Sequence, residues 1–412
     1  MGEEIFAHPE LGYKETRTAD LVESKFRQMG ARYRSSLAIT GVKARLPGSR
    51  CRASVGILGE LDAVLCHDHP SADPQTGAVH ACGHNAQIAA LIGAGFGLVD
   101  SGVMGLLDGD VVLLAVPAEE YVELEFRQRL REDGRIRFFG GKQELIYRGE
   151  MDDLDLAMIC HSESNTPERK ARVGGSSNGF LGKLVRYLGK EAHAGGAPHE
   201  GVNALNAAVL GMMGINAQRE TFRDEDSIRV HPIITKGGDL VNIVPADVRL
   251  ETYVRAKTVE AIMGANEKVN RALKAGAMAV GAEVTITDVP GYLPLENEPG
   301  LTELFRANLA DLIGSENILA GQHMAGSTDM GDVTHLMPAI HPSCGGVRGR
   351  AHTRDFQIVD PEMAYLIPAK ALAMTAIDLL ADDARLARQI LAGFQPRLTK
   401  DEYLKLWEKL LA

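Results

Sequence analysis

The residues best suited to chemistry begin in a short stretch at positions 79–91, VHACGHNAQIAAL. Cys82 and His84 lie on either side of a glycine, directly before an apolar run that is typical of a buried helix. A thiolate and an imidazole at this spacing can both reach one metal ion. Two other interpretations stay open, because Cys82 could be a buried structural residue or a thiol nucleophile activated by a histidine.

Other candidate ligands and acid–base groups follow apolar, strand-like runs. Glu119 and Glu120 come after DVVLLAVP, and neighbouring side chains on an extended segment point in opposite directions, so one can bind metal while the other faces a substrate. His161 follows LDLAMIC, Asp62 follows a buried run and can orient a ligand histidine, and His352 follows a glycine-rich loop. Alone, each residue also fits a structural role, such as a surface turn or a core histidine.

These candidates together comprise one cysteine, three histidines, two glutamates and one aspartate. A two-metal hydrolytic site needs about five ligands and one free carboxylate that acts as a base. Nearly all of the candidates lie at strand ends or in glycine-containing loops. We therefore predict a dinuclear hydrolytic centre from the set as a whole, although no single motif would support it.

The elements that must position this set alternate between strands and helices. Strand-like runs cover residues 53–64, 110–120 and 154–163, and helical patterns cover 16–29 and 88–99. This order predicts an α/β domain with a mostly parallel sheet. Functional side chains of such sheets gather at the carboxyl ends of the strands, which is where the candidate ligands lie.

The pattern of strand-like and helical segments changes around Gly174. From there to residue 290, the patterns predict a compact α+β insert with two helices on one four-stranded sheet. The catalytic domain would then be discontinuous, with a first part at 1–173 and a second part at 291–412 around the insert at 174–290. We expect the highly charged segment Leu124–Lys142 to form a solvated helix and loop. Because it lies beside PAEE, it could also form one side of the active site.

Composition and charge argue against several classes of protein. The chain has 412 residues and a formal charge of -11 without a basic stripe, so we do not expect nucleic acid as a partner. Its longest apolar run, 86–99, is too short to span a membrane, and the N-terminus lacks the apolar core of a signal peptide. The five scattered cysteines indicate reduced thiols. We expect a soluble cytoplasmic protein without a membrane partner.

Eight motifs occur in order along almost the whole chain: AHPELGYKE, GELDA, HACGHN, PAEE, HAGGAPHEGVNAL, VNIVPAD, GSTDMGDV and AHTRDF. They resemble the zinc aminoacylase–carboxypeptidase metallopeptidase family, in particular its hippurate hydrolase, auxin-conjugate hydrolase and aminobenzoyl-glutamate hydrolase branch. The resemblance implies two divalent metal ions per subunit, either zinc, manganese or cobalt, and a homodimer whose insert is a lid and dimerisation domain. Asn85 stands where this branch more often has Asp, and Leu124–Lys142 is longer than in the simplest members. Neither departure removes a ligand.

The resemblance also assigns the roles of individual residues. The metal ligands that it implies are Cys82, whose thiolate reaches both ions, His84, Glu120, His161 and His352. Glu119 becomes the general base, and His193 of the insert reaches into the active site of the other subunit to stabilise the oxyanion. The implied substrate-binding residues are Asn242, Arg255, Ser327 and Thr328, and Asp62 supports a ligand. An ordinary strand-end salt bridge remains the alternative for Arg255.

The activity implied is metal-dependent hydrolysis of an amide bond in an N-acyl amino acid, an amino-acid conjugate or a dipeptide-like substrate. Metal-bound hydroxide would attack the carbonyl carbon while Glu119 moves the proton. Arg255 suits a free carboxylate on the substrate, because a guanidinium binds a carboxylate through two parallel hydrogen bonds. Two alternatives remain, a catalytically silent binding or scaffold member of the same fold and an amidase with Cys82 as its nucleophile.

Overall fold

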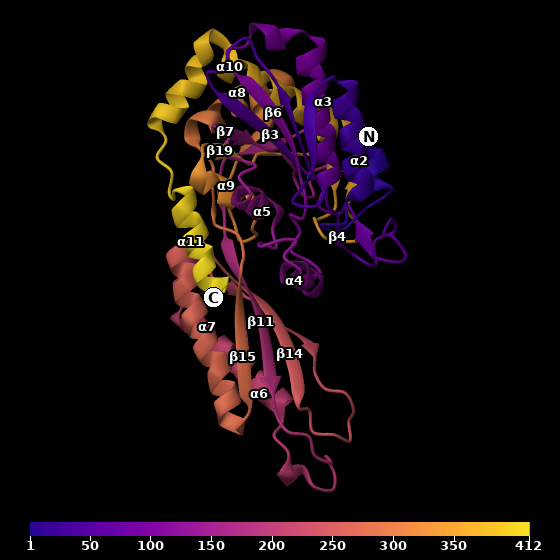
Figure 1. The fold of residues 1–412 in the computed structure, drawn as a ribbon, viewed down its shortest axis with the longest axis vertical. Coiled ribbons are helices and arrows are strands. Elements are labelled where there is room, and N and C mark those ends of the chain that lie inside the picture. The colour runs from indigo at the N-terminus through magenta and orange to yellow at the C-terminus, as the bar shows by residue number, and fades with distance from the viewer. Residues whose placement is uncertain (412) are drawn as a thin grey trace. The chain divides into compact units, whose positions relative to one another are not determined.

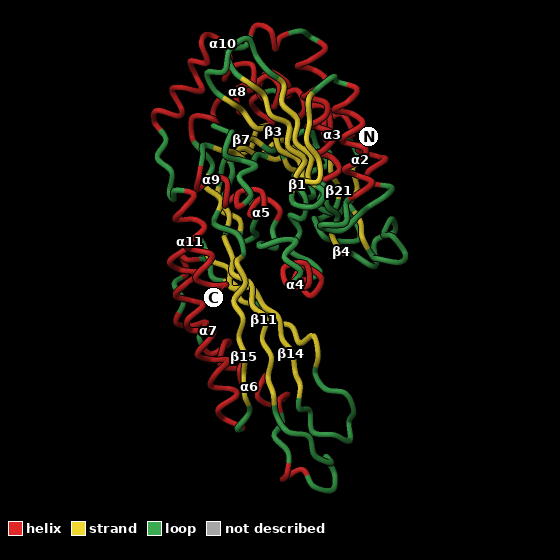
Figure 2. Tube along the Cα trace, in the orientation of Figure 1, coloured by secondary structure: helices red, strands yellow, loops and turns green. Residues whose placement is uncertain are grey.

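The computed structural model describes residues 1–411, which form two compact units (Figures 1 and 2). Unit 1 contains Met1–Ser176, Glu296–Gln322 and Asp332–Lys400. Unit 2 contains Ser177–Leu295, His323–Gly331 and residues 401–411. The segment 291–412, which we expected to lie wholly in the catalytic domain, is thus divided between the two units.

Unit 1 is built on a six-stranded sheet in the order β1-β2-β6-β3-β7-β19. Its strands are β1 (Arg32–Leu37), β2 (Gly41–Leu46), β3 (Ser54–Glu60), β6 (Asp110–Val116), β7 (Leu156–Met158) and β19 (Ala339–Ile340). The strands β6, β3, β7 and β19 are parallel to one another, whereas β1 and β2 add antiparallel pairs at one edge. The prediction of an α/β fold with a mostly parallel sheet is confirmed.

The central strands β3 and β6 end at the same edge of this sheet. Every residue of both strands is buried, as is usual for parallel strands that are covered on both faces. The register pairs Glu60, the last residue of β3, with Val116, the last residue of β6. Since β7 runs parallel to β3, the segments that follow all three strands begin at this edge.

Four helices pack against the sheet in one hydrophobic core, namely α2, α3, α8 and α10. The helix α3 can approach β6 closely because residue 95 is glycine, and a Cβ there would lie 2.6 Å from Cδ1 of Leu113. The helices that contribute to unit 1 are α1 (Gly2–Phe6), α2 (Thr16–Gln28), α3 (His84–Asp100), α4 (Leu124–Glu132), α5 (Gly141–Tyr147), α8 (Pro299–Ile313), α9 (Met330–Leu336) and α10 (Ile367–Gly393).

The remaining strands outside the sheet of unit 2 are short. A second sheet of unit 1 has the order β17-β9-β20-β8, with β17 (Ile318–Ala320), β9 (Ala171–Val173), β20 (Ser343–Cys344) and β8 (His161–Ser162). Two strand pairs are β4 (Val64–Leu65) with β5 (Ala78–Val79), and β21 (Val347–Arg348) with β22 (Gln357–Ile358). Where the chain passes between the units lie β10 (Ser176–Ser177), β16 (Leu295–Glu296) and β18 (His323–Met324).

The charged segment Leu124–Lys142 is not the solvated helix and loop that we expected. It forms α4 and the start of α5, and much of it is buried, including Leu124, Arg127, Leu130, Phe138, Phe139 and Lys142. The apolar residues of α4 recur on one face and pack inward, while Arg127 and Lys142 find polar partners inside the unit. The expectation rested on the number of charged residues, which does not show that the apolar residues of α4 lie on one face of the helix.

The segment Glu362–Gly393 is long and apolar enough to cross a membrane by length and composition alone. This criterion is weak evidence, because core helices of soluble proteins also meet it, and 61% of the apolar window is buried inside the protein. Its helix α10 is interrupted at Ala381–Ala384, where Asp382 and Asp383 have left-handed backbone conformations. The segment therefore serves as a core helix of unit 1.

Unit 2 consists of an antiparallel sheet and helices, as predicted for the insert. The strand order is β12-β14-β11-β15, which gives the four positions that we expected. The position beside β14 holds two short strands, β12 and β13. Pro232 separates them, because proline cannot donate a backbone hydrogen bond to the neighbouring strand. The strands are β11 (Gly179–Leu188), β12 (Arg229–Val230), β13 (Ile233–Lys236), β14 (Asp247–Ala256) and β15 (Glu283–Pro290). The helices α6 (Ala204–Ala217) and α7 (Val259–Val280) pack on one face of this sheet (Figure 1). The last helix of the chain is α11 (Lys400–Leu411).

Candidate metal centre and active site

Cys82 and His84 are held by a tight turn at the start of α3. Gly83 between them has a left-handed conformation with a φ of 90°. A Cβ at this position would lie 2.3 Å from Oγ of Ser162, so both the backbone conformation and the available space require glycine. The turn brings Sγ of Cys82 to 3.4 Å from Nε2 of His161.

The other candidate ligands come from strand ends and from one distant loop. Glu119 and Glu120 follow β6, and His161 lies just after β7, at the start of β8. His352 belongs to the loop between β21 and β22, and its backbone N–H donates to the carbonyl oxygen of Ala81 at 2.8 Å. This hydrogen bond ties the loop to the residue that precedes Cys82.

The structure brings all five sequence-predicted ligands together within unit 1. Potential ligand atoms form three groups, and the atoms of each group lie within 4.8 Å of one another. The groups are Cys82 with His84 and His161, Cys82 with Glu120 and His352, and Glu60 with His84 and Glu119. Because Cys82 belongs to two groups, its sulfur is placed where a thiolate could contact two ions.

The donor atoms suit divalent metals. Nδ1 of His84 and of His161 each donates to a backbone carbonyl oxygen, of Asp62 and Ser162 respectively, at 2.9 Å, which leaves Nε2 of both rings as the ligand atom. Nε2 of His84 and Oε1 of Glu120 are buried, and neither makes a hydrogen bond of good geometry within the described residues. Thiolate, imidazole and carboxylate are the ligands of zinc sites in proteins.

Mutual charges shift the pKa values of the cluster. Burial and the Glu120 carboxylate raise the pKa of the Cys82 thiol, but His161 and His84 outweigh them and lower it to about 6. The Glu120 carboxylate raises the pKa of His352 to about 11, and Nε2 of His352 lies 3.1 Å from Oε1 of Glu120. Metal ions would replace the protons on these imidazoles, so metal binding should release protons and depend on pH.

Sequence reasoning missed Glu60, which the structure places in the third group of potential ligand atoms. Oε2 of Glu60 lies 3.0 Å from Nε2 of His84 and accepts a hydrogen bond from Nε2 of Gln87 at 2.8 Å. Its other oxygen pairs with Nζ of Lys142, and both side chains of this ion pair are almost completely buried. The signal that could have found it is its position at the end of a buried strand, two residues before Asp62.

The predicted Asp62 contacts two of the ligand segments. Its backbone oxygen accepts from His84, and its Oδ2 accepts from the backbone N–H of Glu120 at 2.8 Å. The side chain itself is completely buried. These contacts suit the supporting role that we expected for Asp62.

The remaining predicted site residues lie in unit 2 and form two local groups. His193 and Asn242 lie on adjacent backbone segments, since Ala194 N–H donates to the oxygen of Asn242 at 2.8 Å. Nδ1 of His193 accepts from the N–H groups of Gly195 and Gly196, so the proton of a neutral ring is on Nε2.

The second group contains Arg255 and the other predicted pocket residues, Ser327 and Thr328. Nη1 of Arg255 donates to Oγ of Ser327 at 2.8 Å, and the guanidinium lies over the rings of Phe180 and Tyr253. Thr328 is buried next to Ser327. Both roles that we predicted for Arg255, binding of a carboxylate and a strand-end salt bridge, stay predictions.

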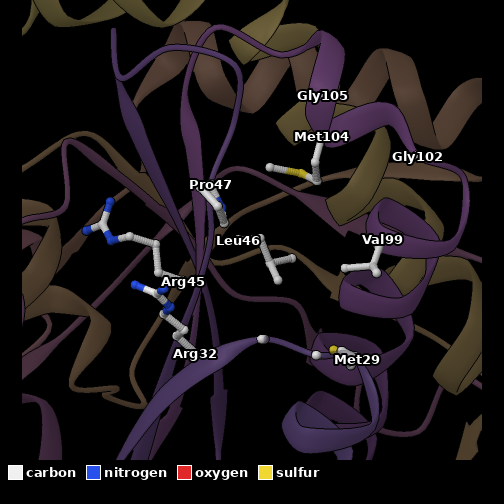
Figure 3. A pocket seen from close by; sticks show the side chains of 11 residues that line it. Met29, Arg32, Arg45, Leu46, Pro47, Val99, Gly102, Met104 and Gly105 are labelled. Atoms are coloured by element: carbon white, nitrogen blue, oxygen red, sulfur yellow. The ribbon is translucent and has the colours of Figure 1, made fainter.

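A cavity of about 760 Å³ in unit 1 is separate from this site (Figure 3). Residues from the ends of α2, β2 and α3 line it, among them Met29, Arg45, Leu46 and Val99. The residue Leu46 pairs with Val111 near the start of β6, so the cavity lies at the end of the sheet opposite the ligands. None of the proposed ligands lines it.

The fold and the donor set define a metal-binding hydrolase with a peptidase architecture. Residues 56–376 match the model of peptidase family M20/M25/M40, and the chain belongs to this family. It is a hydrolase that acts on amide bonds. The recognition of the metallopeptidase family from the eight motifs is thereby confirmed.

Individual relatives agree with this assignment. The chain is 30% identical to the Xaa-Arg dipeptidase of Homo sapiens over 385 residues, which cover 89% of this chain and 78% of the relative. It is 24% identical to the IAA-amino acid hydrolase ILR1-like 4 of Arabidopsis thaliana, over 85% of this chain and 77% of the relative. A solved dinuclear metal binding peptidase of the M20 family from Bacillus subtilis has the same fold, with a TM-score of 0.68 at 20% identity over 92% of this chain and 96% of that structure.

Proposed function

We propose that this hydrolase cleaves the amide bond of a dipeptide, an N-acyl amino acid or an amino-acid conjugate that carries a free carboxylate. The observation that carries the proposal is the position of Cys82 in two groups of potential ligand atoms, one of which contains Glu120, while Glu119 shares a third group with His84. The names of the relatives support the substrate class, because they include a dipeptidase and an amino-acid-conjugate hydrolase.

Two divalent ions, zinc, manganese or cobalt, would be held by Cys82, His84, Glu120, His161 and His352. When bound, such ions polarise a substrate carbonyl and lower the pKa of water to about 7. In this proposal Glu119 accepts the proton of the attacking water and then delivers it to the leaving amine. Its carboxylate is nearly buried, and Oε2 lies 3.8 Å from Nε2 of His84, so it is close to the ligand atoms.

Unit 2 would complete the site by supplying His193 and the carboxylate-binding residues. The protonated Nε2 of His193 is suited to donate to the developing oxyanion, in the site of the partner subunit of a homodimer. Asn242, Arg255, Ser327 and Thr328 would bind the substrate. We place the protein in the cytoplasm, because its five cysteines are free thiols even where Sγ of Cys160 and of Cys344 lie 3.6 Å apart.

Metal removal tests the proposal directly. We expect chelation to abolish hydrolysis of a panel of N-acyl amino acids and dipeptides, including dipeptides that end in arginine, and zinc, manganese or cobalt to restore it. The measurement is the rate of amine release, with the metal content determined on the same samples. Full turnover by a verified metal-free preparation would contradict the proposal and favour Cys82 as a nucleophile.

The paired variants Glu119→Gln and Glu120→Gln separate the base from the ligand. Glu119→Gln should keep its metal and substrate binding but lose at least ~10²-fold in kcat, because glutamine cannot accept the proton. Glu120→Gln should instead lose metal. If the metal content falls in the first variant and stays constant in the second, the two roles are the reverse of those proposed.

A further inference from the structure

Two buried carboxyl groups hold the backbone on both sides of Glu119. Ala118 N–H donates to Oε1 of Glu15 at 2.8 Å, and Glu120 N–H donates to Oδ2 of Asp62 at 2.8 Å. Ala118 itself has a φ of 53°, a left-handed conformation that costs energy in a residue other than glycine. Such a conformation persists only where surrounding contacts determine it.

The carbonyl groups of the same loop point to the guanidinium of Arg127. Nη1 of Arg127 donates to the oxygen of Phe139 at 2.7 Å and to the oxygen of Ala118 at 3.4 Å, and Nη2 donates to the oxygen of Glu120. The side chain is only 1% exposed. One planar cation thus connects the carbonyl oxygens of the two residues that flank Glu119.

The surroundings of Arg127 are shaped to receive it. The guanidinium carbon lies 5.4 Å from the ring centre of Tyr13 and 5.8 Å from that of Tyr121, at distances where a cation and an aromatic ring attract each other. Gly12 leaves the space for the charged end, since a Cβ there would lie 2.4 Å from Nη2.

The helix α5 closes the other side of the loop. Gly141 N–H donates to the oxygen of Ala118 at 3.2 Å, and a Cβ on Gly141 would lie 1.6 Å from the oxygen of Pro117. The segment that contains α4 and the start of α5 is therefore packed against the loop that carries Glu119.

We propose that Arg127 is a positioning residue for Glu119 and Glu120, and that Leu124–Lys142 serves to bring it there. Rotation of the peptide groups at Ala118 or Glu120 would redirect both carboxylates, and the two hydrogen bonds from Arg127 to their carbonyl oxygens oppose such rotation. The proposal takes the catalytic role of Glu119 from the proposed function. The geometry of the loop itself does not depend on that role.

The test compares Arg127→Met and Arg127→Lys with the matched control Arg129→Met. Arg129 lies two residues later in α4 and is exposed, so its replacement should change nothing. Lysine keeps the charge of Arg127 but cannot reach all three carbonyl oxygens, and it provides a second variant if methionine prevents folding. Hydrogen exchange of peptides that span residues 117–122, β6 and α3 would be measured on the metal-free and metal-loaded protein, together with kcat and KM.

We expect exchange in 117–122 to accelerate at least about tenfold in both Arg127 variants, while β6 and α3 remain as protected as in the wild type. The kcat value should fall about 10- to 100-fold with KM within about twofold, and lysine should retain more activity than methionine. Unchanged exchange in 117–122, or equal acceleration in all peptides, would overturn the proposal. If exchange changes as expected but the wild type hydrolyses none of the proposed substrates, the proposed function fails and the positioning role stands.

Discussion

The buried carboxyl groups of unit 1 differ in the charges that surround them. Glu60 pairs with Lys142, and the charge of Lys142 lowers the pKa of Glu60 even though burial raises it. Glu120 pairs with His352, which lowers its pKa to about 2 against the effect of burial. The carboxyl group of Glu15 accepts hydrogen bonds from the hydroxyl of Thr40 and from the backbone N–H of Ala118, and burial, together with the Asp62 charge, raises its pKa to about 7.

We expect Glu15→Gln to remove a pH dependence of stability. The pKa of Glu15 is about 7 in the folded protein against 4.5 in the unfolded chain, so its stabilising contribution is complete below pH 4.5 and is lost as the pH rises through 7. The difference in free energy of unfolding between wild type and variant should fall over this range by up to about 3 kcal/mol. Urea unfolding of the metal-free proteins at roughly pH 5 to 8 measures this difference in free energy.

Glutamine is the appropriate replacement because it can accept from Ala118 N–H and donate to Oγ1 of Thr40, as a protonated Glu15 would. Glu3→Gln, at an exposed position, serves as the control. If the wild type and Glu15→Gln respond in parallel to pH, Glu15 is ionised in the folded protein throughout this range.

At the scale of elements, one turn, several strand ends and the loop that carries His352 make the candidate metal centre. The parallel strands β3, β6 and β7 deliver their following segments to one edge of the sheet, and the first turn of α3 adds Cys82 and His84 beside them. Gly83 is the point at which backbone conformation and ligand position are coupled most directly.

Replacement of Gly83 by alanine should therefore disrupt metal binding, whereas Gly97→Ala in the same helix should not. The added Cβ at Gly83 would meet Ser162 at a φ of 90°, and both neighbouring ligands would have to move. We expect metal affinity to fall about 10- to 100-fold, as for loss of a contact that orients a ligand. At Gly97 no atom lies within 4 Å of an added Cβ, and alanine should stabilise the helix by about 0.5–1 kcal/mol.

Metal titration and thermal unfolding of both variants provide the measurements. Equal metal affinities for Gly83→Ala and Gly97→Ala would mean that the turn is not what positions Cys82 and His84. The contrast between the variants does not depend on any assay of hydrolysis.

At the scale of the whole molecule, the proposed chemistry is distributed over two units. The candidate ligands and Glu119 belong to unit 1, whereas His193, Asn242 and Arg255 belong to unit 2. A site that uses both sets in a homodimer would contain groups from two chains.

Mixing two inactive variants tests whether the active site is shared. The kcat of His193→Ala should fall ~10²–10³-fold, because the variant lacks a hydrogen-bond donor to the oxyanion. Glu119→Gln should be inactive because it lacks the general base. In a mixed dimer, one site would combine the intact Glu119 of one chain with the intact His193 of the other. We expect recovery of at most about half of the wild-type activity per mixed dimer, if the two sites are independent.

Subunit exchange must be shown separately, for example with chains that carry different tags. A mixture of Glu119→Gln with Glu120→Gln is the control, because both defects lie in unit 1 and no mixed dimer can restore a site. An absence of recovery despite proven exchange would mean that His193 serves its own chain.

The sequence by itself determined the features that depend on residues close together in the chain. Buried strands that end in polar residues predicted the parallel sheet and its functional edge, and the pattern of the insert predicted two helices on one sheet, which the structure shows as α6 and α7. The ordered motifs were sufficient to identify the family and to name Cys82, His84, Glu120, His161 and His352, which the structure brings together.

Only the tertiary structure decided which charged residues are buried and what they contact. Glu60 and Lys142 are 82 positions apart, and Glu15 and Ala118 are 103 apart, so no local periodicity reveals either contact. Arg127 looked like one more charge in a solvated segment, yet it lies inside unit 1 because three carbonyl oxygens and two aromatic rings converge on it. A charge is buried only where the folded chain supplies its partners. For Glu60 and Glu15 these partners are distant in the sequence, whereas for Arg127 they are carbonyl groups of nearby loops whose orientation only the folded backbone decides.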